Sequence, residues 1–117
     1  MMGSRVAVMG FAVDTSWTDG CAVISVAGEL DMGAESIVRA CLEEVFAAPG
    51  AAVVLDLSAT TFMDARGISI LVAARAMAER SRVAFHVVGI RPRLRSTLKV
   101  VGLDTVFPDT HPDPYPT

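Results

Sequence analysis

The chain contains few side chains that could perform catalysis or bind a metal. Of its two histidines, His86 lies inside an apolar run and His111 lies among prolines near the C-terminus. A single histidine in an apolar strand is usually a structural residue, and no Cys/His spacing typical of zinc occurs. The sequence also lacks a metal-binding carboxylate pattern and a glycine-rich phosphate loop. It therefore predicts no enzyme, no metal and no cofactor.

Other polar residues sit where apolar segments end. Ser58 follows an apolar run without a base in the pattern, as a strand-end cap would. Asp56 interrupts the same run, which predicts either a contact at a strand edge or a hydrogen bond to a neighbouring loop. Glu29 and Asp31 flank Leu30 just before a helical pattern, so they fit a capping and turn role as well as a binding site.

Composition indicates a single globular domain. The 117 residues are 52% hydrophobic and 20% charged, and the net charge of -3 gives no general attraction to nucleic acid or anionic membranes. Residues 1–13 lack a signal-peptide pattern, and no apolar run reaches membrane-spanning length, so we expect a cytoplasmic protein without membrane insertion. Cys21 and Cys41 fall in apolar periodic segments and read as small core residues. A local basic cluster reads as the solvated face of a short helix: Arg91, Arg93, Arg95 and Lys99.

Apolar periodicity predicts alternating strands and helices. Strands are expected at 11–13 (an edge strand), 21–27, 53–57 and 83–88, and helices at about 34–45, 65–79 and 92–101, with 103–107 as a last strand or docking segment. This order predicts a mixed sheet covered by helices. We expect an N-terminal extension at 1–9, one domain at 10–107 and a flexible proline-rich tail at 108–117.

The second helix is expected to begin abruptly after a buried strand. Asp64 is a good N-cap, because its carboxylate can accept hydrogen bonds from the free N–H groups of the first turn. Gly67 predicts a close backbone approach, either by the sheet or by a partner. The predicted buried stripe of this helix is Gly67, Ile70, Leu71, Ala74, Met77 and Ala78. Ile68 and Val72 lie off this stripe, which indicates a contact patch beside the helix start.

Three ordered segments carry a family resemblance. Val26–Asp31, Val53–Ser58 and Phe62–Ile68 resemble the STAS domains of bacterial anti-sigma factor antagonists. Further matches in spacing follow at Gly89, Arg93, Leu98, Gly102, Leu103 and Phe107. The resemblance covers about residues 10–107 and implies the STAS fold, an α/β domain with a four- to five-stranded mixed sheet and helices packed mainly on one face.

The resemblance also implies partner switching in transcription regulation. In that family the antagonist binds an anti-sigma factor, often an ATP-binding serine kinase, and so frees a sigma factor. The kinase phosphorylates a serine in an Asp-Ser-Ser/Thr-Gly motif, and the added charge breaks the complex. Here the motif reads Asp64-Ala65-Arg66-Gly67, so both hydroxyl positions are lost and no phosphorylation is possible at Ala65 or Arg66.

Three functions are compatible with the loss of both hydroxyl positions from the motif. The chain is an antagonist without phosphorylation control at the usual position, a non-phosphorylated scaffold in a signalling assembly, or a STAS subunit of a transport complex. For the antagonist, Arg66 is expected to pair with a partner carboxylate. The expected partner-binding residues are Glu29, Asp31, Asp64, Ala65, Arg66, Gly67, Ile68, Ser69 and Val72. We expect a monomer or a weak dimer, with edge pairing at the Phe11 or Phe107 ends.

Overall fold

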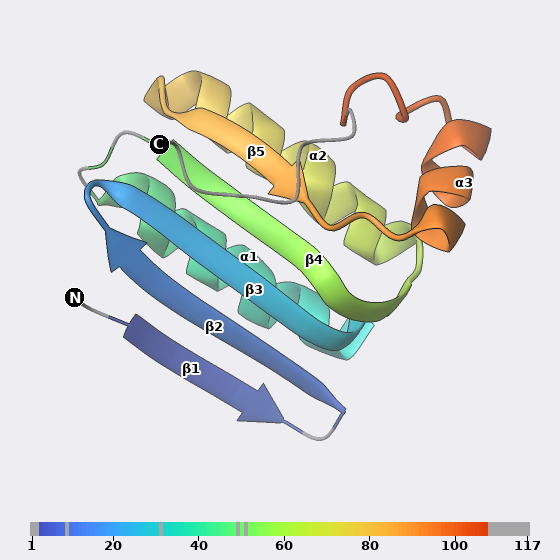
Figure 1. Cartoon of the computed structure of the whole chain (residues 1–117), viewed down its shortest axis with the longest axis horizontal. Coiled ribbons are helices and arrows are strands. Elements are labelled where there is room, and N and C mark those ends of the chain that lie inside the picture. The colour runs from blue at the N-terminus through green and yellow to red at the C-terminus, as the bar shows by residue number, and fades with distance from the viewer. Residues whose placement is uncertain (1–2, 9, 31, 49, 51, 108–117) are drawn as a thin grey trace.

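The fold is built on a five-stranded mixed sheet (Figure 1). A computed structural model describes residues 3–8, 10–30, 32–48, 50 and 52–107. The strands lie in the order β1-β2-β3-β4-β5; their bounds are β1 Gly3–Val8, β2 Phe11–Thr18, β3 Cys21–Leu30, β4 Ala52–Met63 and β5 Ala84–Val88. The β1/β2 and β2/β3 pairs are antiparallel, whereas β3/β4 and β4/β5 are parallel. This arrangement confirms the predicted mixed sheet.

The two longer helices connect the parallel strands and pack on one face of that sheet. Helix α1 (Met32–Ala47) joins β3 to β4, α2 (Ala65–Ser81) joins β4 to β5, and α3 (Pro92–Val100) follows β5. Figure 1 shows α1 and α2 side by side behind the sheet, with α3 at one end. None of the helices in the described residues combines the length and the apolar character needed to cross a membrane.

The apolar stripes of both long helices lie where the sequence predicted them. In α1 the buried residues are Ala34, Val38, Leu42, Val45 and Phe46, whereas Ile37 and Cys41, which belong to the same predicted stripe, are partly buried against the core. In α2 the buried residues are Gly67, Ile70, Leu71, Ala74, Met77 and Ala78, which is the predicted stripe. They meet alternate residues of the central strands, such as Ile24 and Leu55, in the main core.

The five strands agree with the predicted number of four to five, but some of them differ from the predicted ranges. Strand β1 was not predicted. It pairs with β2 and is itself the edge strand of the sheet, so the prediction of an edge strand at Phe11 is wrong. Strand β4 continues to Met63, beyond the predicted end at residue 57, because β3 continues beside it to Leu30. Pairing with the neighbouring strand β3 thus outweighs the weak strand propensity of the small and polar residues at 58–61.

Residues 103–107 form a docking segment of turns and not a strand. Phe107 is buried in the main core, and Arg95 Nη1 donates hydrogen bonds to the carbonyl oxygens of Asp104 and Phe107. Arg91 also binds the backbone, at the Ser58 carbonyl. The basic cluster is therefore only in part a solvated face, because two of its guanidinium groups hold backbone segments in place. The predicted tail at 108–117 lies outside the described residues.

Candidate functional site

The first turn of α2 is fixed by its cap. Asp64 Oδ1 accepts hydrogen bonds from the backbone N–H of Arg66 at 2.9 Å and of Gly67 at 3.3 Å. Asp64 itself has extended backbone geometry, as an N-cap residue should. The cap satisfies two of the helix's free N–H groups and confirms the predicted role of Asp64.

Gly67 lets the first turn lie directly on the end of the sheet. A Cβ atom there would lie 2.3 Å from Met63 Cγ and 3.0 Å from the Leu30 carbonyl oxygen. Both groups belong to the ends of the parallel strands β3 and β4. Two causes of a close approach at Gly67 were predicted, the sheet and a partner. In the described residues it is the sheet that approaches Gly67.

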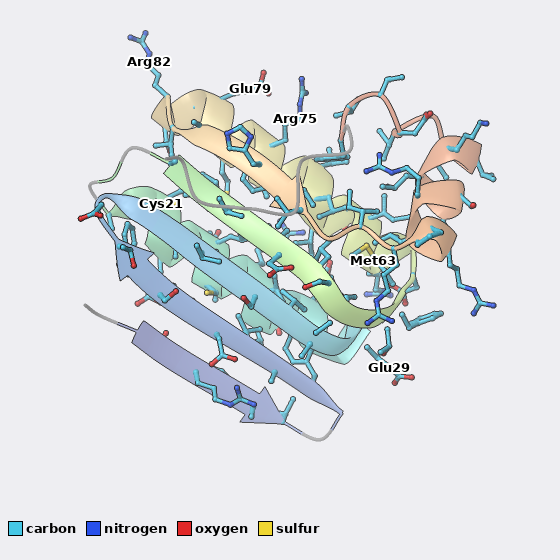
Figure 2. All side chains as sticks on the ribbon, viewed as in Figure 1. Cys21, Glu29, Met63, Arg75, Glu79 and Arg82 are labelled. Atoms are coloured by element: carbon cyan, nitrogen blue, oxygen red, sulfur yellow. The ribbon has the colours of Figure 1, made fainter. Side chains whose placement is uncertain are left out.

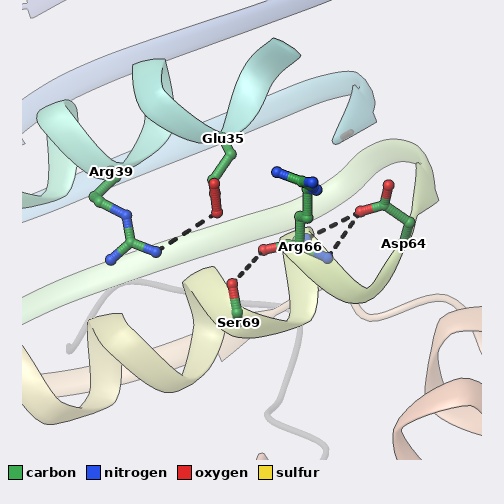
Figure 3. A network of polar contacts seen from close by, with 6 residues as sticks. Glu35, Arg39, Asp64, Arg66 and Ser69 are labelled. Carbon is green, nitrogen blue, oxygen red and sulfur yellow. Dashed lines mark hydrogen bonds and ion pairs between the residues drawn. The ribbon is translucent and has the colours of Figure 1, made fainter. Parts of the chain in front are cut away.

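The outward side of this turn is open. Ala65, Arg66 and Ser69 are exposed, Val72 is 46% exposed, and Ile68 is partly buried against the core. Figure 3 shows the turn beside the Glu35–Arg39 ion pair of α1, whose N···O distance is 3.7 Å. In the described part of the chain the Arg66 guanidinium has no ion-pair partner, so its charge is available to a carboxylate from outside.

Phe62 extends this surface and was not predicted as a site residue. It is 51% exposed and lies opposite the exposed Glu29 in the β3/β4 register. Figure 2 shows Glu29 and Met63 at the same end of the sheet, far from Cys21. The only sequence signal for this exposure is the position of Phe62 directly before the buried Met63 and the Asp64 cap. Successive side chains of a strand point to opposite faces, so Phe62 points outward. Asp31, the other predicted acid, lies outside the described residues.

Three of the hydroxyl groups near the turn donate hydrogen bonds. Ser69 Oγ donates to the Arg66 carbonyl at 2.8 Å, and Thr60, which is buried, donates to the Val26 carbonyl at 2.9 Å. Ser58 Oγ donates to Asp56 Oδ1 at 2.6 Å. Thr61 is exposed on β4. At positions 65 and 66 the exposed side chains carry no hydroxyl.

A second polar cluster, formed by Asp56, Ser58, Gly89 and Arg91, supports β4 just before the site. Asp56 Oδ1 also accepts from the Ser58 backbone N–H at 2.9 Å, and Arg91 Nε and Nη2 donate to the Ser58 carbonyl at 2.9 and 2.7 Å. A Cβ at Gly89, whose φ is +73°, would lie 2.7 Å from the Ser58 backbone nitrogen. Asp56 and Ser58 therefore hold the irregular part of β4 and perform no visible chemistry.

Neither the sulfur atoms nor the acids form a reactive centre. Cys21 and Cys41 are free thiols, and burial raises the pKa of both. Cys21 is buried as predicted, whereas Cys41 is only partly buried, with Sγ 3.1 Å from Thr15 Oγ1. In the described ranges no group of three or more His, Cys, Asp or Glu residues could hold a metal. The candidate site is a surface at a helix start that combines exposed apolar side chains with charged ones.

Comparison with known proteins agrees with this geometry. The family model described as the STAS domain matches residues 12–115. The anti-sigma-F factor antagonist RsfB of Mycobacterium tuberculosis is 35% identical over 89 residues, which cover 76% of this chain and 72% of RsfB.

Two solved structures extend the comparison. An anti-sigma factor antagonist from Mycobacterium paratuberculosis superposes with a TM-score of 0.76 at 32% identity, covering 95% of this chain and 90% of the other. The unphosphorylated antagonist SpoIIAA gives a TM-score of 0.72 at 20% identity, over 85% of this chain and 88% of the other, and so shares the fold. The antagonist family is non-enzymatic, which confirms the prediction of no catalysis. The chain belongs to the STAS-domain proteins and, among them, to the anti-sigma factor antagonist family.

Proposed function

We propose that this chain binds an anti-sigma factor of the ATP-binding serine kinase type through the first turn of α2, and that no phosphorylation at positions 65 and 66 controls the binding. The observation that carries the proposal is the exposed, Asp64-capped turn that presents Ala65 and Arg66. Its antagonist relatives support the class of partner. The absence of a hydroxyl at both positions supports the loss of control there.

The proposed partner surface is centred on Arg66. It comprises Glu29, Phe62, Asp64, Ala65, Arg66, Gly67, Ile68, Ser69 and Val72, with Asp31 as a further proposed member outside the described residues. Phe62 and Val72 provide exposed apolar area, and Arg66 provides one positive charge between them in sequence. An apolar contact flanked by one charged pair is a common composition for a protein interface.

Arg66 also carries a small cost that binding would offset. A cation near a helix N-terminus is unfavourable by roughly a few tenths of a kcal/mol, because the helix dipole is positive there. A partner carboxylate that pairs with the guanidinium would more than compensate for it.

The charge reversal Arg66→Glu tests the proposed surface. We expect it to weaken anti-sigma factor binding by at least about 1 kcal/mol, through loss of the ion pair and new repulsion. The same change should leave the free energy of unfolding unchanged or raise it slightly, because an acid suits the first turn. Isothermal titration and urea unfolding measure the two effects.

Arg75→Glu is the matched control. Arg75 lies on the same helix and is exposed, about 13 Å further along the axis. It forms only an exposed pair with Glu79 at 3.7 Å, which contributes roughly 0–1 kcal/mol. Arg75→Glu should leave the affinity unchanged. Equal affinities for the two variants and the native chain would remove Arg66 from the interface.

A further inference from the structure

Strand β1 forms one edge of the sheet, and its outer side is unpaired in the described part of the chain (Figure 1). All six of its residues are exposed. In an antiparallel pair, alternate residues of a strand direct their backbone N–H and C=O groups away from the neighbouring strand. Part of the β1 backbone is therefore able to form hydrogen bonds with a further strand.

This edge carries little of the protection that edge strands commonly have. Unpaired edges are usually blocked by proline, by a β-bulge or by charged side chains that repel a second strand. The strand reads Gly-Ser-Arg-Val-Ala-Val, without proline, and its register with β2 runs from Gly3 to Val8 without a shift. Its one charge, on Arg5, is balanced by an ion pair with Asp14 of β2, at an N···O distance of 2.6 Å. The edge is thus open to a further strand.

On the helix side of the sheet, the apolar core continues outward to this edge. Directly opposite residues of an antiparallel pair lie on the same face. Val6 lies opposite Val13, which is 2% exposed in the main core, but Val6 itself is 46% exposed. Val8 lies opposite Phe11, which is 6% exposed, but Val8 itself is 50% exposed. The apolar rows of the core therefore end at the edge as two uncovered valines.

We propose that two copies of this chain pair through β1, antiparallel and about a two-fold axis at Val6. Two-fold symmetry is the commonest in soluble oligomers, and it places the same strand on both sides of the contact. In this register Val6 lies opposite its own counterpart, and Ser4 lies opposite Val8. The valines of both copies stay on the helix side, so the two uncovered apolar rows meet.

The charge on β1 selects this register among its neighbours. Pairing about Val6 places Arg5 opposite Ala7, so that no charge lies opposite a like charge. Pairing about Arg5 would place two guanidinium groups directly opposite each other, which is destabilising. Phe11, where edge pairing was expected from the sequence, lies on β2, which already has β1 on one side and β3 on the other.

The expected dimer is reversible and leaves the surface at the start of α2 uncovered. The contact is limited to two strands of six residues and the side chains beside them, which is less than most permanent interfaces use. The dimer should therefore depend on concentration. Helix α2 packs behind the part of the sheet that lies opposite the β1 edge (Figure 1). The inference thus does not rest on the proposed anti-sigma factor binding.

Sedimentation equilibrium of surface variants tests the β1 contact. Val6→Lys should raise the dissociation constant of the dimer at least about tenfold, because it places two like charges opposite each other at the axis. Val101→Lys is the matched control, since Val101 is 53% exposed but directly follows α3. It should change the constant by less than about twofold. A native chain that stays monomeric up to about 1 mM, or equal constants for the two variants, would overturn the proposal.

A cross-linking measurement does not depend on the folding of Val6→Lys. Val6→Cys, in a chain in which Cys21 and Cys41 are replaced by alanine, should form a disulfide-linked dimer on mild oxidation. Opposite residues of an antiparallel pair lie within the distance that a disulfide spans. Val101→Cys in the same background should remain largely monomeric on a non-reducing gel. Equal cross-linking of the two variants would overturn the pairing at Val6.

Discussion

The two faces of helix α2 differ in what constrains their residues. The inward face, which includes Ile70, Leu71 and Ala74, is fully buried and must match the shape of the sheet. The outward face of the first turns, which includes Ala65 and Arg66, contacts no core and is free to vary without a packing cost. The side chains at these positions can therefore change while the architecture is kept. Changes on the inward face should affect stability, and changes on the outward face should affect binding.

The adjacent residues Leu71 and Val72 give the largest contrast. Leu71 is 0% exposed, so Leu71→Ala should lower the free energy of unfolding by about 2–5 kcal/mol. Val72→Ala should cost no more than about 0.5 kcal/mol of stability, yet weaken anti-sigma factor binding. Urea unfolding and titration of both variants check this. Similar stability losses for the two would contradict the division between the faces.

Gly67 lies at the boundary between the faces, and Gly67→Ala should have an intermediate effect. Alanine favours a helix by about 1 kcal/mol over glycine, but its Cβ would meet Met63 and the Leu30 carbonyl. Met63 can move its side chain, whereas the Leu30 carbonyl belongs to the paired strand β3. We expect a net loss of about 1–3 kcal/mol in urea unfolding. A gain in stability would show that the helix start is not pressed against the sheet.

The smallest stability effect is expected at the cap. Asp64→Ala should lower the free energy of unfolding by about 1 kcal/mol, because two first-turn N–H groups lose their acceptor. Asp64→Asn keeps an acceptor oxygen and should cost only a few tenths of a kcal/mol. If both variants lose the same amount, the negative charge and not the hydrogen bond is what stabilises the turn.

The sequence predicted those parts of the fold that local patterns determine. The stripes of α1 and α2 follow a 3.6-residue period, and the cap at Asp64 follows from its side-chain chemistry, so both were predicted and are observed. The predictions that were wrong or missing depend on distant partners. Strand β1 exists because β2 pairs with it, and β4 reaches Met63 because β3 runs beside it. Neither pairing can be read from a short window of residues.

The site was predicted in the same uneven way. The turn from Asp64 to Ser69 was proposed as a site from its motif, whereas Phe62, now part of the proposed surface, was not, since an aromatic residue near a buried strand is more often inside than outside. Its exposure follows from the extended course of β4, which was itself not predicted. The supporting role of Arg91 could not be predicted either, because it depends on a contact between distant parts of the chain: its acceptor, the Ser58 carbonyl, lies 33 positions earlier.

The central proposal is binding to an anti-sigma factor without phosphorylation control, and native mass spectrometry tests it most directly. The protein would be mixed with each ATP-binding anti-sigma kinase of the same genome, first with ADP and then with ATP. We predict a complex that persists under ATP, with no phosphate added to this chain. A phosphate adduct that disrupts the complex would show that another hydroxyl, such as Thr61 or Ser69, controls binding. A failure to bind any of the kinases would contradict the antagonist function itself.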